Sequence, residues 1–232
     1  MSVFYPIHTN IRNKIFWLIL FLVWPFGSII FAVYKFRNNF SKNIVWFYAI
    51  FYGYNIIIPS QGYDAFRYVQ QFEYIALNRM PLTEVFSNYF RTSETLDIYE
   101  PLLMILASVL SDDYRVFYAI AGLVFGFFYS RNLWIILDRV DGPVGKILFL
   151  YMLSYAFISP LFAVQFIRFS TATQVFIFGV LIYLLKNKQS GLFVSAFSVL
   201  IHFSFFIPVA LLVLFSIIPK KLTLLFIFFI VA

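Results

Sequence analysis

Two isolated polar side chains in the apolar second half of the chain, Arg168 and His202, are the best candidates for chemistry. Arg168 lies in FAVQFIRFSTATQ and His202 in VSAFSVLIHFSFFIP, and no Asp or Glu follows Asp141. Burying a cation among apolar residues typical of membrane helices costs free energy unless the cation faces the interior of a bundle or a water-filled cavity and is paired there. We therefore expect a partner that is either the distant acidic segment or an anionic ligand.

Arg168 is predicted to stand at the mouth of a helix and to bind substrate. Gln165 and Thr171, at i−3 and i+3, give it a polar face. A guanidinium suits bidentate binding of phosphate. The alternative is a snorkelling arginine that reaches for lipid phosphate.

His202 is predicted to lie near the middle of a membrane helix, below a polar stripe that contains Ser195 and Ser198. The charge of an unperturbed histidine changes near physiological pH, so His202 is a candidate catalytic base. The alternative is a structural histidine that joins two helices through a hydrogen bond.

Further candidates occur in the acidic middle of the chain. In SQGYDAFRYVQQF, helical spacing places Asp64, Arg67 and Tyr68 on one face. Asp64 is a second candidate catalytic residue, and Arg67 and Tyr68 are candidate substrate ligands; the alternative is a capping aspartate with a solvated ion pair. Glu100, in Tyr99-Glu100-Pro101, is a further substrate ligand or a first-turn acid favoured by the helix dipole.

Composition defines the class of protein. The chain is 62% hydrophobic and 12% charged, with a mean hydropathy of +0.89. These values predict an all-α, polytopic integral membrane helix bundle. Its basic residues are dispersed between apolar segments, which argues against nucleic-acid binding. The absence of cysteine excludes disulfides and thiolate metal sites, no phosphate-binding glycine motif is present, and we expect neither a cofactor nor a metal.

The apolar runs predict a single transmembrane domain over residues 1–232. A spanning helix needs about 20 apolar residues. The final run stops about halfway through a crossing, so we expect the chain to be incomplete at its C-terminus. Spans are expected near 15–34, 44–59, 116–137, 147–164, 169–185 and 192–218, with a partial span at 222–232.

Charged loops predict the orientation. The short loops that contain Lys35 to Lys42, Arg139 to Lys146, and Lys186 with Lys188 are expected in the cytoplasm. Residues 60–115 hold eight of the ten acids and form the external loop. Within it, 64–78 and 82–90 predict amphipathic interfacial helices, and 99–111 is too short to span and predicts a re-entrant or interfacial helix. The N-terminus is then expected outside.

Several short motifs follow one another along the chain: Gly62-Tyr63-Asp64 with Tyr68, Tyr99-Glu100-Pro101, Phe166-Ile167-Arg168, a lysine-containing turn, Ser195-Ala196 and Leu200-Ile201-His202-Phe203-Ser204. In this order they resemble the EpsG-like family of Wzy-type polysaccharide polymerases over roughly residues 56–214. The chain departs from the family pattern at three places: it has no arginine in IPSQ before Gly62, Phe169 follows Arg168, and Leu102 follows Glu100-Pro101.

The resemblance implies a multi-pass enzyme of the bacterial inner membrane that polymerises undecaprenyl-diphosphate-linked repeat units of O-antigen, capsule or exopolysaccharide. Arg168 would hold the diphosphate, and His202 or Asp64 would activate the acceptor hydroxyl. Expected partners are the lipid-linked oligosaccharide, membrane lipids, and a flippase and a chain-length regulator of the same pathway. The alternatives are a lipid-linked oligosaccharide flippase or an integral-membrane acyltransferase.

Overall fold

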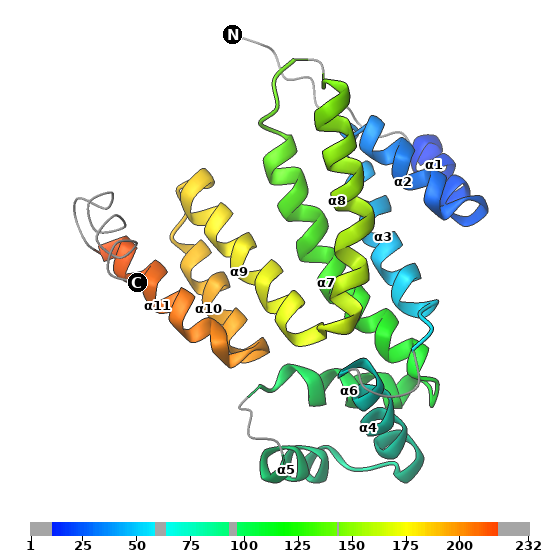
Figure 1. The fold of residues 1–232 in the computed structure, drawn as a ribbon, viewed down its shortest axis with the longest axis vertical. Coiled ribbons are helices and arrows are strands. Elements are labelled where there is room, and N and C mark those ends of the chain that lie inside the picture. The colour runs from blue at the N-terminus through cyan, green and yellow to red at the C-terminus, as the bar shows by residue number, and fades with distance from the viewer. Residues whose placement is uncertain (1–10, 59–63, 93–96, 143, 218–232) are drawn as a thin grey trace.

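The structure is a computed structural model that describes residues 11–58, 64–92, 97–142 and 144–217, and all regular structure within these ranges is helical. The predicted all-α class is thereby confirmed. Helices that run lengthwise form one bundle (Figure 1). They are α3 (Ser41–Tyr54), α7 (Tyr114–Leu137), α8 (Lys146–Gln165), α9 (Ile167–Lys186), α10 (Ser190–Ile201) and α11 (Phe206–Ile217).

Helix α7 is the centre of the bundle and packs most extensively against α3 and α9. Its contact with α3 depends on Gly122 and Gly126, one helical turn apart. A Cβ atom on Gly122 would clash with the carbonyl oxygen of Ala49, and one on Gly126 would clash with the Ala49 side chain. Small residues at i and i+4 allow two helix backbones to approach closely, as is common between membrane helices.

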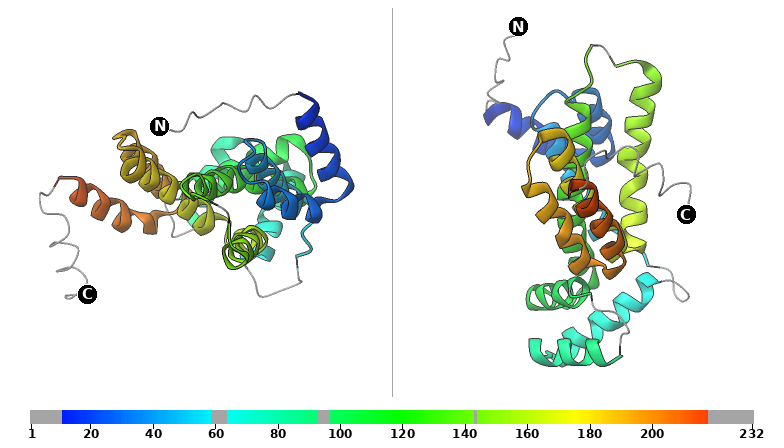
Figure 2. Two further views of the ribbon diagram at one scale, coloured as in Figure 1. Left: turned by 90° about the horizontal axis from the view of Figure 1, so that it is seen from above. Right: turned by 90° about the vertical axis from the view of Figure 1, so that its left-hand side faces the viewer.

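Three helices lie across one end of this bundle and form what we term the cap layer: α4 (Asp64–Asn78), α5 (Leu82–Thr92) and α6 (Tyr99–Leu110). Both amphipathic helices predicted for segment 60–115 are present at the predicted positions. Helix α4 buries Val69 and Phe72 as its periodicity predicts, and Tyr118 of α7 donates a hydrogen bond of 2.8 Å to its backbone. Helix α6 lies crosswise to α7 (Figures 1 and 2).

The opposite end of the bundle, here called the basic end, is formed by residues 35–40, 138–142, 144–145 and 187–189 of the connecting loops. Side chains from these loops bind neighbouring backbone. Arg37 donates hydrogen bonds to the carbonyl oxygens of Val140 (3.4 Å) and Gly142 (2.5 Å). Arg139 donates to the carbonyl of Leu185 at 2.9 Å. The predicted cytoplasmic loops therefore share one end of the molecule, and the cap layer lies at the other.

The first predicted span, 15–34, is wrong as a single helix. It is divided into α1 (Ile11–Val23) and α2 (Pro25–Tyr34), which lie side by side as a hairpin (Figure 1). Pro25 has no N–H to continue the hydrogen-bond ladder, and its ring would clash with the carbonyl four residues earlier. Trp17 of α1 packs on Phe31 of α2 with 4.9 Å between ring centroids. Helix α1 thus begins beside the end of α2, towards the basic end.

The last long predicted span, 192–218, is also divided. Helix α10 ends at Ile201, His202 is extended (φ −151°, ψ 113°), and a 3₁₀ turn, η1 (Phe203–Phe205), leads into α11. Pro208 explains the break, because a continuous helix would need a donor to the Ser204 carbonyl where proline has none. The chain reverses here, so His202 does not lie in mid-helix. It lies at the cap-layer end of the bundle.

The remaining spans agree more closely with the expectation. Predicted segments 116–137, 147–164 and 169–185 correspond to α7, α8 and α9 within two residues at each end, whereas α3 ends at Tyr54, before the predicted limit. By length and hydropathy, α7 and α9 are the described helices that could cross a membrane. The partial span at 222–232 lies outside the described residues.

Candidate functional site

Two chain reversals bring Arg168 and His202 together. Phe166 (φ −126°, ψ 59°) separates α8 from α9 and places Arg168 in the first turn of α9. The break after α10 places His202 at the same end of the bundle as Arg168, next to the cap layer. A cation is disfavoured at a helix N-terminus, where the dipole is positive. Arg168 therefore needs a carboxylate partner from another element.

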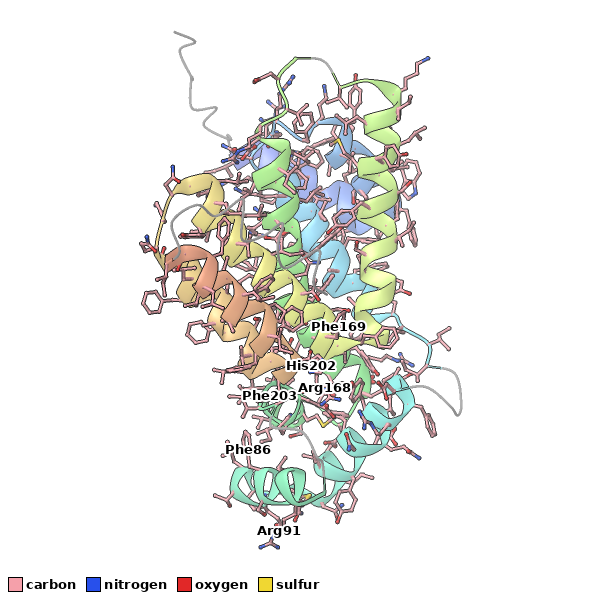
Figure 3. The ribbon with its side chains drawn as sticks, turned by 60° about the vertical axis from the view of Figure 1, so that its left-hand side comes forward. Phe86, Arg91, Arg168, Phe169, His202 and Phe203 are labelled. Atoms are coloured by element: carbon pink, nitrogen blue, oxygen red, sulfur yellow. The ribbon has the colours of Figure 1, made fainter. Side chains whose placement is uncertain are left out.

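That partner is Asp97, which lies just before α6 and is completely buried. One of its oxygens, Oδ2, accepts a hydrogen bond from Arg168 Nη1 at 3.0 Å and lies 3.2 Å from His202 Nδ1. The other, Oδ1, accepts the backbone N–H of Phe203 at 2.7 Å. A single carboxylate thus joins α9 and the α10–α11 reversal to the cap layer. Figure 3 shows Arg168, His202 and Phe203 gathered where these helices meet the cap layer.

Glu100 and Tyr68 complete the surroundings of the guanidinium. The buried Glu100 carboxylate lies 3.1 Å from Arg168 Nε. Tyr68 of α4 lines the same cavity as Arg168, and burial raises the pKa of its phenol, which therefore stays protonated at neutral pH. We refer to Asp97, Glu100, Arg168 and His202 as the Asp97 cluster. With His202 neutral, its formal charge is −1.

The cluster borders a cavity of about 410 Å³. Arg168 is nearly buried beside it, with 14% of its side chain exposed, whereas His202 is 28% exposed. The imidazole is held edge-on against Phe169, with ring centroids 5.8 Å apart. A molecule in the cavity can therefore reach the imidazole more readily than the carboxylates. The lining residues are Asp64, Tyr68, Phe166, Arg168, Phe169 and His202.

The contacts of Asp97 determine what His202 can do. Its carboxylate also accepts hydrogen bonds from Arg168 and Phe203, so it acts as a hydrogen-bond acceptor towards His202. We assign the proton of neutral His202 to Nδ1 from this network, which leaves Nε2 with a lone pair. A histidine oriented by a buried carboxylate is the arrangement that removes a proton from a hydroxyl in many hydrolases and transferases.

Other predicted site residues have different positions. Asp64 lines the cavity but forms its ion pair with Arg67, 3.7 Å away, and both side chains are about half exposed. Arg67 stacks on the ring of Tyr68 at 5.3 Å and is not among the cavity-lining residues. Thr171 is buried one turn inward, where it accepts a hydrogen bond from the Tyr99 hydroxyl at 3.4 Å. The side chain of Gln165 lies outside the described residues.

Asp97 is the central residue that sequence reasoning missed. It is one of eight acids in segment 60–115, and nothing in its type separates it from the others. A signal was nevertheless present: Asp97 precedes Glu100 by three residues, so the two carboxylates enter the same region of the fold. The pairing of Arg168 with the acidic segment was one of the two predicted alternatives.

Comparison with known proteins yields no match: no family model matches this chain, and neither a curated protein nor a solved structure matches it. Within the ranges that the structure describes, no group of three or more His, Asp or Glu side chains that could hold a metal ion is found.

Proposed function

We propose that the chain is a multi-pass protein of the bacterial inner membrane, with the basic end in the cytoplasm and the cap layer at the outer surface. Large apolar side chains such as Leu150 on α8, Phe193 on α10 and Ile207 on α11 are 59%, 73% and 67% exposed. In water such surfaces would drive association, whereas lipid covers them. The positive charges of the basic end favour the cytoplasmic side.

In this orientation the α1–α2 hairpin enters and leaves the membrane on the cytoplasmic side. Arg12 and Lys14, in the first turn of α1, then join the other cytoplasmic cations. The sequence alone predicts that the N-terminus lies outside, which conflicts with the positive-inside rule because of these two cations. With the hairpin, the start of α1 lies on the cytoplasmic side, as the rule requires.

For the activity, we propose glycosyl transfer from a polyprenyl-diphosphate-linked oligosaccharide to a hydroxyl of a second lipid-linked unit. The observation that carries this proposal is the position of Asp97, which orients a histidine beside an arginine at a cavity on the proposed outer side. The resemblance to Wzy-type polymerases supports the substrate class. A flippase and a chain-length regulator would be partners in the same pathway.

In the proposed reaction, Nε2 of His202 removes the proton from the acceptor hydroxyl. The acceptor oxygen attacks the anomeric carbon, a new glycosidic C–O bond forms, and the bond between that carbon and the diphosphate oxygen breaks. The leaving diphosphate keeps the electron pair. Asp97 stabilises the imidazolium that forms, and Arg168 offers positive charge to the diphosphate from the cavity edge. Tyr68 and Asp64 would contact the sugars.

The test uses a bacterial strain that lacks the gene and carries the full-length protein on a plasmid. His202→Asn retains a side chain that can hydrogen-bond Asp97 but removes the base. Polymer formation should fall about 100-fold or more, leaving single-repeat glycans on the lipid. The matched control is Glu73→Gln on the exposed face of α4, which should polymerise normally. Normal long-chain polymer in His202→Asn would overturn the proposal.

A second candidate is acyl transfer to a sugar hydroxyl, because the formal charge of the Asp97 cluster is already negative and disfavours a diphosphate. The same strain separates these activities. Loss of an acyltransferase would leave the polymer length unchanged and remove ester-linked groups from the glycan, as measured by mass spectrometry. Loss of a flippase would remove even the single-repeat product from the outer surface.

A further inference from the structure

The basic end contains a second cavity, far from the Asp97 cluster. Its volume is about 760 Å³, and it lies between the end of α2, the loop after α2 and the start of α8. Three cations contribute to its lining: Lys35, Arg37 and Lys146. No carboxylate is among the described lining residues, although the exposed Asp141 lies in the adjoining loop.

An apolar groove continues from this cavity. It has a volume of about 420 Å³ and is lined from α1, α2 and α8, for example by Leu20, Ile30 and Phe149. Tyr34 and Phe149 line both spaces, so the basic cavity and the groove adjoin. Gly27 also lines the groove, and a Cβ at this position would clash with the indole of Trp24.

We propose that this composite site binds an anionic phospholipid of the cytoplasmic leaflet. The headgroup phosphate would contact the ammonium groups of Lys35 and Lys146, and an acyl chain would occupy the apolar groove. Charge complementarity identifies the occupant: basic pockets between membrane helices on the cytoplasmic side bind anionic headgroups, and a zwitterionic lipid offers no net charge to them. Arg37 donates to the Val140 and Gly142 carbonyls and so fixes the loop that forms the rim.

The position also explains why the occupant is a structural lipid and not the lipid-linked substrate. The Asp97 cluster is at the cap-layer end, so a substrate diphosphate that reaches it cannot simultaneously lie at the basic end. A lipid seated between α1–α2 and α8 would cover the exposed faces of Phe16 and Trp24, which are 53% and 59% exposed. The lipid site depends on the proposed membrane placement and is independent of the glycosyl transfer.

The test measures thermal unfolding and lipid retention of the full-length protein in detergent. Added phosphatidylglycerol should raise the melting temperature more than equal phosphatidylcholine, and native mass spectrometry should retain phosphatidylglycerol preferentially. The double variant Lys35→Gln/Lys146→Gln should bind phosphatidylglycerol at least about tenfold more weakly. The matched control, Lys186→Gln/Lys188→Gln, removes two exposed cations from the same end outside the cavity and should bind within about twofold of the unmodified protein.

A third variant separates a lipid from a free anion. Ile30→Trp narrows the apolar groove and keeps every cation, so it should weaken phosphatidylglycerol binding, whereas inorganic phosphate alone should stabilise none of the proteins. Equal effects of the two lipids, equal losses in both lysine pairs, or full stabilisation by phosphate would overturn the proposal. Loss of the lipid site with polymer formation intact would still support it, because the two functions use opposite ends.

Discussion

At the residue scale, two ion pairs of this protein differ in how much the loss of one partner would destabilise the fold. The Asp64–Arg67 pair is half exposed, and such pairs contribute about 0–1 kcal/mol. Asp97 is buried, with Arg168, His202 and the Phe203 backbone around it. Removing one member of a buried network leaves the others desolvated and unpaired, which costs far more than removing an exposed one.

Asp97→Asn should therefore destabilise the protein by about 3 kcal/mol, because the neutral amide cannot balance Arg168 and turns an N–H group towards donors. Chemical unfolding in detergent would measure it. The matched control is Asp113→Asn, since Asp113 caps α7 from an exposed position and asparagine caps equally well. If both variants lost the same stability, Asp97 would not be the energetic centre of the site.

Sequence reasoning at this scale found the cations and not their main partner. Arg168 and His202 stand out because they are isolated in apolar sequence. Asp97 does not stand out, since it lies in a polar stretch with several other acids. Its burial is a consequence of the long-range contact between the cap layer and two chain reversals, and local periodicity carries no information on such contacts.

At the element scale, the site depends on the register between α9, which carries Arg168, and α10, which leads to His202. The two helix backbones approach each other closely at Gly179 and Gly191. A Cβ on Gly179 would clash with the Ser195 hydroxyl and would lie 2.5 Å from the Gly191 carbonyl oxygen. These small residues fix how far the two helices slide past each other.

Gly179→Val should separate α9 from α10, with an expected cost of about 1–3 kcal/mol for overpacking. Polymer formation should fall although no residue of the Asp97 cluster is changed. The same substitution at Gly145, where a Cβ meets nothing within 4 Å, is the control and should be nearly neutral in both assays. Equal behaviour of the two variants would contradict a positioning role for the α9–α10 contact.

The sequence predicts where helices form more reliably than where a helix is interrupted. Apolar runs located α7, α8 and α9, because length and hydropathy alone define them. Length and hydropathy also predicted one helix where α1 and α2 occur and one where α10 and α11 occur. A run of hydrophobic residues does not indicate where the backbone hydrogen bonds of a helix are interrupted. Pro25 and Pro208 carried that information, and both breaks follow from the missing N–H of proline.

At the scale of the whole molecule, the proposed orientation places the described loops of the basic end and the first turn of α1 on the cytoplasmic side, as the positive-inside rule requires. The chain has no cysteine, so single cysteines can report on each loop without background. Asn78→Cys and Ser111→Cys flank α5 and α6 and should both react with a membrane-impermeant thiol reagent in spheroplasts. Arg12→Cys and Asn187→Cys should react only after the membrane is opened.

The pair at Asn78 and Ser111 is the decisive comparison, because α6 lies between them. Labelling of one from outside and the other only from inside would mean that α6 crosses the membrane, and the order of every later helix would be inverted. Labelling of Arg12→Cys from outside would contradict the α1–α2 hairpin.

One contact at the site is made by the main chain, and this affects how the protein could diverge. Asp97 receives the N–H of Phe203, not its side chain, which is 50% exposed. Nineteen of the twenty amino acids supply the same donor, and only proline removes it. Drift at position 203 would thus leave the bond untouched. A comparison of sequences cannot detect this hydrogen bond, because no particular side chain is needed at position 203. A comparison of backbone conformation around the reversal can detect it.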